Sequence, residues 1–261
     1  MNLDLSNKNA LIAGSTQGIG LAIAKELALL GANCILIARN ETKLKQAVQS
    51  LHTIDGQQHR YLVADFSNYH QVETVIGDFM LNNTIHILIN NTGGPAGGPI
   101  TEASPEAFLS AFQQHLLCNQ IITQAVIPGM KAEKFGRIVN VVSTSVKIPL
   151  KNLGVSNTIR GAVASWAKTM SNELAPFGIT VNNVLPGATA TQRLESIINN
   201  KADKTGAERG EVEEEMIHEI PMKRFGAPEE IASLAAYLCS PSAGYLTGVS
   251  IPVDGGRTGS L

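Results

Sequence analysis

The sequence is poor in the residues that mark several common classes of protein. Its 261 residues include only three cysteines and one tryptophan, and aromatic residues make up 5%. No two cysteines form a Cys-x-x-Cys pair, and apolar residues flank each of them. We therefore expect Cys34, Cys118 and Cys239 to be buried free thiols in a reducing compartment.

Long hydrophobic runs and an excess of basic charge are also missing. No apolar run approaches the ~20 residues of a membrane-spanning helix. Met1–Asn9 lacks the basic start and long apolar stretch of a secretory signal, so a cytoplasmic location is expected. The net charge of −2 argues against a protein dedicated to nucleic-acid binding, because there is no basic excess to neutralise phosphates. The histidines show no metal-ligand spacing, so no metal site is expected.

Short apolar segments alternate with segments of helical periodicity along almost the whole chain. The expected strands are Ala10–Ala13, Cys34–Ala38, Tyr61–Ala64, Ile85–Ile89, Arg137–Val142, Ile179–Val184 and Val249–Val253. The expected helices are Ile19–Leu30, Glu41–Leu51, Tyr69–Leu81, one long or two shorter helices in Pro105–Met130, Asn157–Leu174 and Pro228–Leu238. Apolar strands joined by helices predict an α/β fold: one doubly wound Rossmann-type domain over residues 1–261, with a parallel sheet of about seven strands and helices on both faces.

One segment, residues 191–220, is long and polar and carries an acidic cluster at Glu211, Glu213, Glu214 and Glu215. It follows an expected strand, at the edge where open α/β sheets bind ligands. We expect a helical lid over a substrate, and the alternative is a solvated pair of surface helices.

A glycine-rich turn joins the first strand to the first helix. Glycines at 14, 18 and 20 allow a sharp turn and let backbone amides approach a diphosphate at the start of the helix. A glycine triplet alone is weak evidence, but its place after a strand and before a helix strengthens it. Further motifs follow in order: Asn90-Asn91-Thr92-Gly93, Asn140 to Ser143, Pro186-Gly187 and Asp254-Gly255-Gly256.

This series of motifs resembles the short-chain dehydrogenase/reductase family, in particular its 3-oxoacyl-carrier-protein-reductase-like branch, over roughly residues 5–257. The resemblance implies a nicotinamide dinucleotide as cofactor, a small carbonyl or alcohol as substrate, and a homodimer or homotetramer. The cofactor-binding residues that it implies are Gly14, Ser15, Thr16, Gln17, Gly18, Ile19, Gly20, Asp65, Phe66, Asn91, Thr92, Gly93, Pro186, Gly187 and Thr189.

The end of the second strand bears on which dinucleotide is bound. Sites specific for NAD place an acidic residue here for the ribose 2′-hydroxyl, whereas this chain has Ala38 followed by Arg39. A guanidinium suits a 2′-phosphate, so NADP is preferred over NAD. The alternative is that Arg39 is only a surface charge.

The pattern departs from the family at the residues that carry proton transfer. Ser143 matches the family's serine, but Ser156 stands where the family has Tyr, and Arg160 stands where it has Lys. His115 stands at the position of a relay Asn, with Asn119 one helical turn later. A serine hydroxyl is a far weaker acid than the family's Tyr, and an arginine does not give up its proton, so the pair cannot copy the Tyr–Lys chemistry.

The remaining roles stay open at this point. Ser143 and Ser156 are candidates to donate hydrogen bonds to a carbonyl oxygen, and Arg160 is a candidate to hold the cofactor ribose or an anionic group. His115, which titrates near neutrality in its ordinary state, and Lys147 or Lys151 are candidate proton donors, each with a purely structural alternative.

Three functions fit these residues. The first is NADP-dependent oxidoreduction of a carbonyl or alcohol, with a 3-oxoacyl thioester as one candidate, on a rearranged catalytic centre. The second is a catalytically silent nucleotide-binding sensor or scaffold. The third is a non-redox or alkene-reducing reaction on the same fold.

Overall fold

Seven parallel strands form one sheet in the computed structural model, which describes residues 1–54 and 56–260. The sheet order is β3-β2-β1-β4-β5-β6-β7. The strands are β1 (Asn9–Ala13), β2 (Asn33–Ala38), β3 (Arg60–Val63), β4 (Ile87–Asn90), β5 (Gly136–Val141), β6 (Ile179–Pro186) and β7 (Ser250–Val253). The order reverses between β1 and β4, which makes a topological switch point there and confirms the doubly wound fold.

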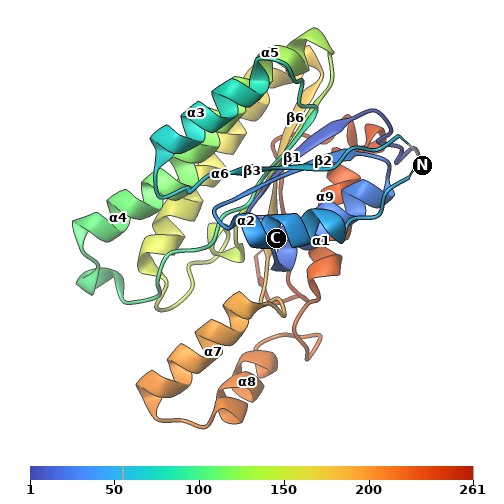
Figure 1. Cartoon of the computed structure of the whole chain (residues 1–261). Coiled ribbons are helices and arrows are strands. Elements are labelled where there is room, and N and C mark those ends of the chain that lie inside the picture. Colours follow the sequence, from blue (N-terminus) through green and yellow to red (C-terminus); the bar gives the residue numbers. More distant parts are fainter. Residues whose placement is uncertain (55, 261) are drawn as a thin grey trace.

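Helices cover both faces of this sheet because its strands are apolar on both sides (Figure 1). α1 (Gly18–Leu29), α2 (Glu41–Gln49) and α9 (Pro228–Cys239) pack on one face with Ile12 of β1. α3 (Tyr69–Met80), α5 (Cys118–Ala132) and α6 (Gly154–Leu174) pack on the other with Leu11. The three cysteines are free and buried, as expected, and no helix among the described residues is long and apolar enough to cross a membrane.

The segment predicted as one long or two shorter helices is interrupted by a π-helical turn. α4 (Pro105–Phe112) leads into a π turn at Gln113–Leu117, and α5 follows directly. A π turn widens the helix by one residue, and such turns often lie at functional sites. His115 lies within this turn.

A row of buried asparagine side chains crosses β4, β5 and β6 and ends at the first residue of β7. The Asn90 amide donates to Asn140 (2.9 Å), Asn140 donates to Asn183 (2.9 Å), and Asn183 donates to the Ser250 hydroxyl (3.0 Å). Each pair is directly opposite in the strand register. A shift of one residue would leave buried amides without partners, at a cost of about 1–3 kcal/mol each, so the row helps to fix the register of four strands.

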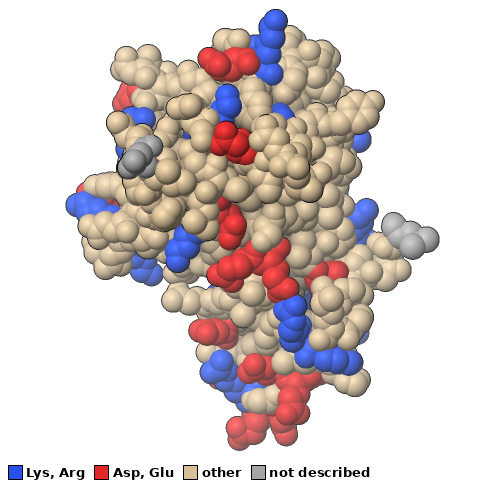
Figure 2. Space-filling model, turned by 90° about the vertical axis from the view of Figure 1, so that its right-hand side faces the viewer, with Lys and Arg blue, Asp and Glu red and all other residues tan. Residues whose placement is uncertain are grey.

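Residues 191–220 contain a helical hairpin that projects beyond the carboxyl edge of the sheet (Figure 1). α7 (Gln192–Thr205) and α8 (Arg209–His218) share a small apolar cluster built on Leu194, Ile198 and Val212. Lys201 and Glu215 join the helices through an ion pair of 2.7 Å. Figure 2 shows charged side chains crowding this end of the molecule. The hairpin therefore has its own core beneath a solvated surface.

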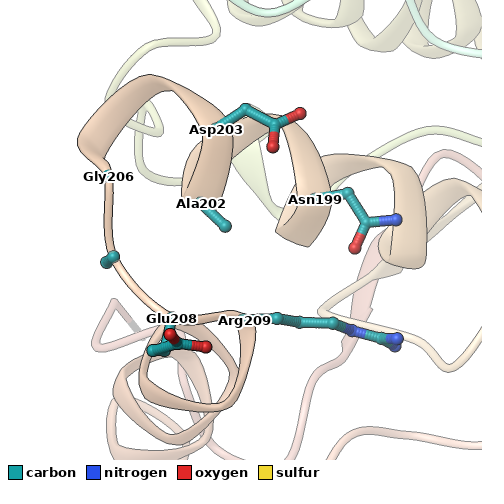
Figure 3. Close-up of a pocket in the computed structure, with 7 residues that line it drawn as sticks. Asn199, Ala202, Asp203, Gly206, Glu208 and Arg209 are labelled. Atoms are coloured by element: carbon teal, nitrogen blue, oxygen red, sulfur yellow. The ribbon is translucent and has the colours of Figure 1, made fainter.

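A hollow of about 390 Å³ opens at the turn between α7 and α8 (Figure 3). Its lining consists of Asn199, Ala202, Asp203, Gly206, Ala207, Glu208 and Arg209. All of these residues belong to the hairpin, and none lies at the carboxyl edge of the sheet. The candidate site for chemistry is therefore elsewhere.

Candidate active site

The glycine turn after β1 packs too tightly for a side chain at Gly14 or Gly20. Gly14 and Gly18 have φ of +58° and +56°, in the left-handed region that favours glycine. A Cβ on Gly14 would lie 2.5 Å from the carbonyl oxygen of Asn91, and one on Gly20 would lie 2.3 Å from the carbonyl oxygen of Gly14. The Asn91 side chain holds the turn by donating to the carbonyl oxygens of Ala13 (3.2 Å) and Gly14 (3.1 Å).

Three helix N-termini meet beside this turn. A hollow of about 240 Å³ is bordered by Gly18 of α1, Gln192 of α7 and Pro228 of α9. The amides at helix N-termini carry a positive partial charge that favours a bound anion, while Glu229 of α9 also lines this hollow. Within the described residues, the Ser15 hydroxyl in the same turn is fully buried and has no hydrogen-bond partner. The residues here fit the diphosphate of a dinucleotide.

The candidate residues for the other end of the dinucleotide lie at the ends of β2 and β3. Arg39 is exposed directly after β2, and Asp65 follows β3. The backbone N–H of Ser67 is the main cause that lowers the pKa of Asp65, and the nearby Arg39 charge lowers it further. Arg39 forms no ion pair in the part of the chain that the structure describes, so its guanidinium can receive a phosphate.

The two serines of the expected catalytic centre lie at the start of neighbouring elements. Ser143 follows β5, and its hydroxyl accepts a hydrogen bond from the Ser145 amide at 3.1 Å. Ser156 lies in the first turn of α6, which begins at Gly154, three residues earlier than expected. Both side chains are half-buried. Lys147 and Lys151, the alternative donors, are exposed on the loop between them.

Arg160 brings a buried positive charge to the carboxyl ends of β4 and β5. The residue is 8% exposed, and its guanidinium donates to the carbonyl oxygens of Val141 (3.1 Å) and Thr92 (3.3 Å). Burial and the nearby Arg193 lower the pKa of Arg160 to about 10, which still leaves the group charged near pH 7. The site therefore holds a fixed cation one helical turn beyond Ser156.

The surroundings of His115 favour its structural alternative over the role of proton donor. Its ring is buried, and Nδ1 is in contact with the Thr92 hydroxyl. Burial, followed by the charges of Arg160 and Arg193, lowers the pKa of His115 to about 3. The ring is therefore neutral near pH 7 and serves as a hydrogen-bonding group, because an imidazolium acid is not populated there.

This lowered pKa predicts a specific acid sensitivity. Because the pKa of His115 falls from 6.5 to about 3 on folding, the unfolded chain binds more protons between these values. The stability contributed by the neutral ring is fully present above pH 6.5 and declines as the pH falls toward 3. We expect His115→Asn to lose less free energy of unfolding than the wild type between pH 7.5 and pH 5. Urea unfolding at the two pH values measures this difference. A wild-type loss of stability between these two pH values that the variant reproduces in full would contradict the prediction.

The loop after β6 completes the edge of the site. The Gly187 amide donates to the Val253 carbonyl oxygen at 2.9 Å, and a Cβ on Gly187 would lie 2.6 Å from that of Asp254. The buried Thr189 hydroxyl donates to the Gly187 carbonyl oxygen at 3.1 Å. Pro186 ends β6 just before this loop, so three of the expected cofactor-binding residues lie together: Pro186, Gly187 and Thr189.

Arg193 is the residue that sequence reasoning missed. It is the second residue of α7, and its guanidinium donates to the Pro95 carbonyl oxygen at 2.7 Å, which places it beside the loop after β4. Its position two residues after Thr191, at the start of the predicted lid, is the only signal that the sequence offers.

Comparisons with known proteins show what the chain as a whole is similar to. Residues 13–258 match the family model described as enoyl-(acyl carrier protein) reductase. The chain is 32% identical to the NADPH-dependent reductase BacG of Bacillus subtilis, over 98% of this chain and 100% of that protein. It is 32% identical to a putative ketoacyl reductase of granaticin polyketide synthase from Streptomyces violaceoruber, over 95% of this chain and 92% of that protein. The crystal structure of L-sorbose reductase from Gluconobacter frateurii, complexed with NADPH and L-sorbose, superposes with a TM-score of 0.92 at 30% identity, covering 100% of both chains.

Proposed function

Because this chain belongs to the short-chain dehydrogenase/reductase family, we propose that it reduces the carbonyl group of a small or medium-sized molecule with NADPH. The chain is an NADP(H)-dependent oxidoreductase of this family. The tight glycine turn and the converging helix N-termini support the same cofactor, because they suit a diphosphate.

The proposed chemistry assigns separate tasks to the residues that replace the family's usual ones. NADPH, when bound, supplies the hydride that adds to the carbonyl carbon. Ser143 and Ser156 donate hydrogen bonds to the carbonyl oxygen. Arg160 stabilises the negative charge that develops on this oxygen, since its own charge is fixed and buried. A proton from solvent then reaches the oxygen through a serine hydroxyl, so the carbonyl becomes an alcohol as NADPH is oxidised.

The observation that carries this proposal is the position of Arg160. Its two backbone hydrogen bonds hold a positive charge where β4 and β5 end, within one helical turn of Ser156. The test is NADPH oxidation by the purified protein against a panel of ketones, oxoacids and 3-oxoacyl thioesters. Oxidation that depends on one of these compounds supports the proposal. Tight NADPH binding with no oxidation by any of them favours a silent nucleotide-binding protein instead.

Arg39 allows a direct test of cofactor choice. We expect Arg39→Ala to weaken NADPH binding by about 10- to 100-fold, because it removes a charge-assisted contact to the 2′-phosphate worth about 1.5–3 kcal/mol. NADH binding should stay unchanged, since NADH lacks that phosphate. Fluorescence titration with each nucleotide measures both values. An equal loss of affinity for both nucleotides would show that Arg39 supports the structure of the site and does not contact the 2′-phosphate.

Three further features belong to the same proposal. The α7–α8 hairpin is a lid over the substrate, supported by the contact of Arg193 with the loop after β4.

The protein is a homodimer or homotetramer, supported by Leu109 and Phe112, which are 69% and 38% exposed on α4. Sedimentation that shows only monomer would refute this assembly. The free buried thiols favour the cytoplasm.

A further inference from the structure

Two arginine side chains from different helices point toward the same spot beside Gly94. If Gly94 carried a Cβ, that atom would lie 3.6 Å from Nη2 of Arg193 and 3.8 Å from Nη2 of Arg160. Arg160 comes from α6, and Arg193 comes from the first turn of α7. Two like charges therefore approach one another at the carboxyl edge of the sheet.

Neither guanidinium has a carboxylate partner within residues 1–54 and 56–260. The ion pairs among the described residues involve neither Arg160 nor Arg193. In the same part of the chain, Arg160 donates to the carbonyl oxygens of Val141 and Thr92, and Arg193 donates to that of Pro95. A guanidinium has five N–H groups, so most of the donors of this pair are still available.

An uncompensated pair of this kind is costly. Arg160 is more than nine-tenths buried, and buried charges are normally paired. Arg193 is exposed, yet its guanidinium lies beside the Pro95 carbonyl and Arg160. Burial, followed by the charges of both arginines, lowers the pKa of His115, so this ring is neutral near pH 7 and does not pair with either arginine. A bound anion would relieve the repulsion.

We propose that Arg160 and Arg193 bind the carboxylate of the substrate, which makes the substrate an oxoacid. The inference rests on the proposed reduction and names its substrate class. Planar guanidinium groups match the two oxygens of a carboxylate. Ser156 and Arg160 are four residues apart on one face of α6, where side chains lie about 5–6 Å apart at Cβ. The carboxylate and the reacting carbonyl are therefore close together in the molecule, as in a short 2- or 3-oxoacid.

The test compares short oxoacids with their methyl esters in the full-length protein. We expect the wild type to favour the acid over the ester by about 100-fold in kcat/KM. Arg193→Gln should lower kcat/KM for the acid at least about tenfold more than for the ester, because only the acid loses a charge-assisted pair. Arg209→Gln is the matched control. It removes the same charge from the same hairpin, in the hollow of Figure 3, and should leave the preference for the acid unchanged.

The other results separate the possible failures. If the ester is reduced as well as the acid, the reduction is right and the carboxylate site is wrong. If Arg193→Gln weakens NADPH binding and leaves the preference for the acid intact, the pair serves the cofactor phosphates and the proposal falls.

If no carbonyl compound is reduced, calorimetry with oxamate and oxalate tests the anion site by itself. Binding that Arg193→Gln abolishes and Arg209→Gln preserves supports the site. Absence of binding to the wild type overturns it.

Discussion

Gly20→Ala is expected to lower the free energy of unfolding by about 3 kcal/mol and to abolish NADPH binding. The added Cβ would lie 2.3 Å from the Gly14 carbonyl oxygen and 2.6 Å from Nδ2 of Asn91. Neither atom can retreat easily, because the Asn91 amide holds the turn through its bonds to Ala13 and Gly14. Relief of the clash therefore has to move α1 or open the turn. Urea unfolding and a fluorescence titration with NADPH measure the two effects.

Gly77→Ala is the matched control for this experiment. Gly77 lies in the interior of α3, and a Cβ there would meet nothing within 4 Å. Alanine is favoured over glycine in a helix by about 0.5–1 kcal/mol, so this variant should be slightly more stable than the wild type. Its NADPH affinity should not change. Similar losses from both substitutions would mean that the close packing of the turn is not the cause.

Ser143→Ala is expected to reduce kcat by about 10²- to 10³-fold, the usual effect of removing one donor to a developing oxyanion. The NADPH dissociation constant should stay within about twofold, because this hydroxyl lies away from the glycine turn and a twofold change is only about 0.4 kcal/mol. Loss of the hydrogen bond from the Ser145 amide should cost about 1 kcal/mol of stability. Steady-state kinetics with an active carbonyl substrate, together with urea unfolding, separate the catalytic effect from the structural one.

Ser145→Ala controls for the loss of a hydroxyl in the same turn. The Ser145 hydroxyl is buried and has no partner among the residues described, so its removal breaks no hydrogen bond there. We expect this variant to keep most of its activity. If Ser145→Ala were the inactive variant and Ser143→Ala the active one, the assignment of the donor would be wrong.

The fold could be predicted from the sequence because its signals are local. Strands such as Cys34–Ala38 are short, apolar and followed by helical periodicity, and each was found within three residues of its expected bounds. The glycine spacing at 14, 18 and 20 marks a turn in which Gly14 and Gly18 adopt backbone angles that favour glycine. The π turn was not predicted, since one extra residue in a helical pattern does not change its apolar spacing visibly.

The centre of the site could be predicted only in part, because its properties depend on neighbours that are distant in the sequence. The positions of Ser143, Ser156 and Arg160 follow from motif spacing. The pKa of His115 depends on burial and on two arginines, one of them 78 residues away, and no spacing rule contains that information. Arg193 was missed for the same reason: its proposed role depends on the lack of an acidic partner among the described residues, which only the folded arrangement reveals.

The asparagine row of the sheet has a consequence for how this sequence can change in evolution. Asn140 both donates to Asn183 and accepts from Asn90, so an apolar residue there would leave two buried neighbours unsatisfied at once. Replacement of the whole row by apolar residues of similar size would leave no buried polar group without a hydrogen-bond partner in the row. We therefore expect a single apolar substitution in the row to cost more stability than replacement of the whole row, so that these positions are expected to change together.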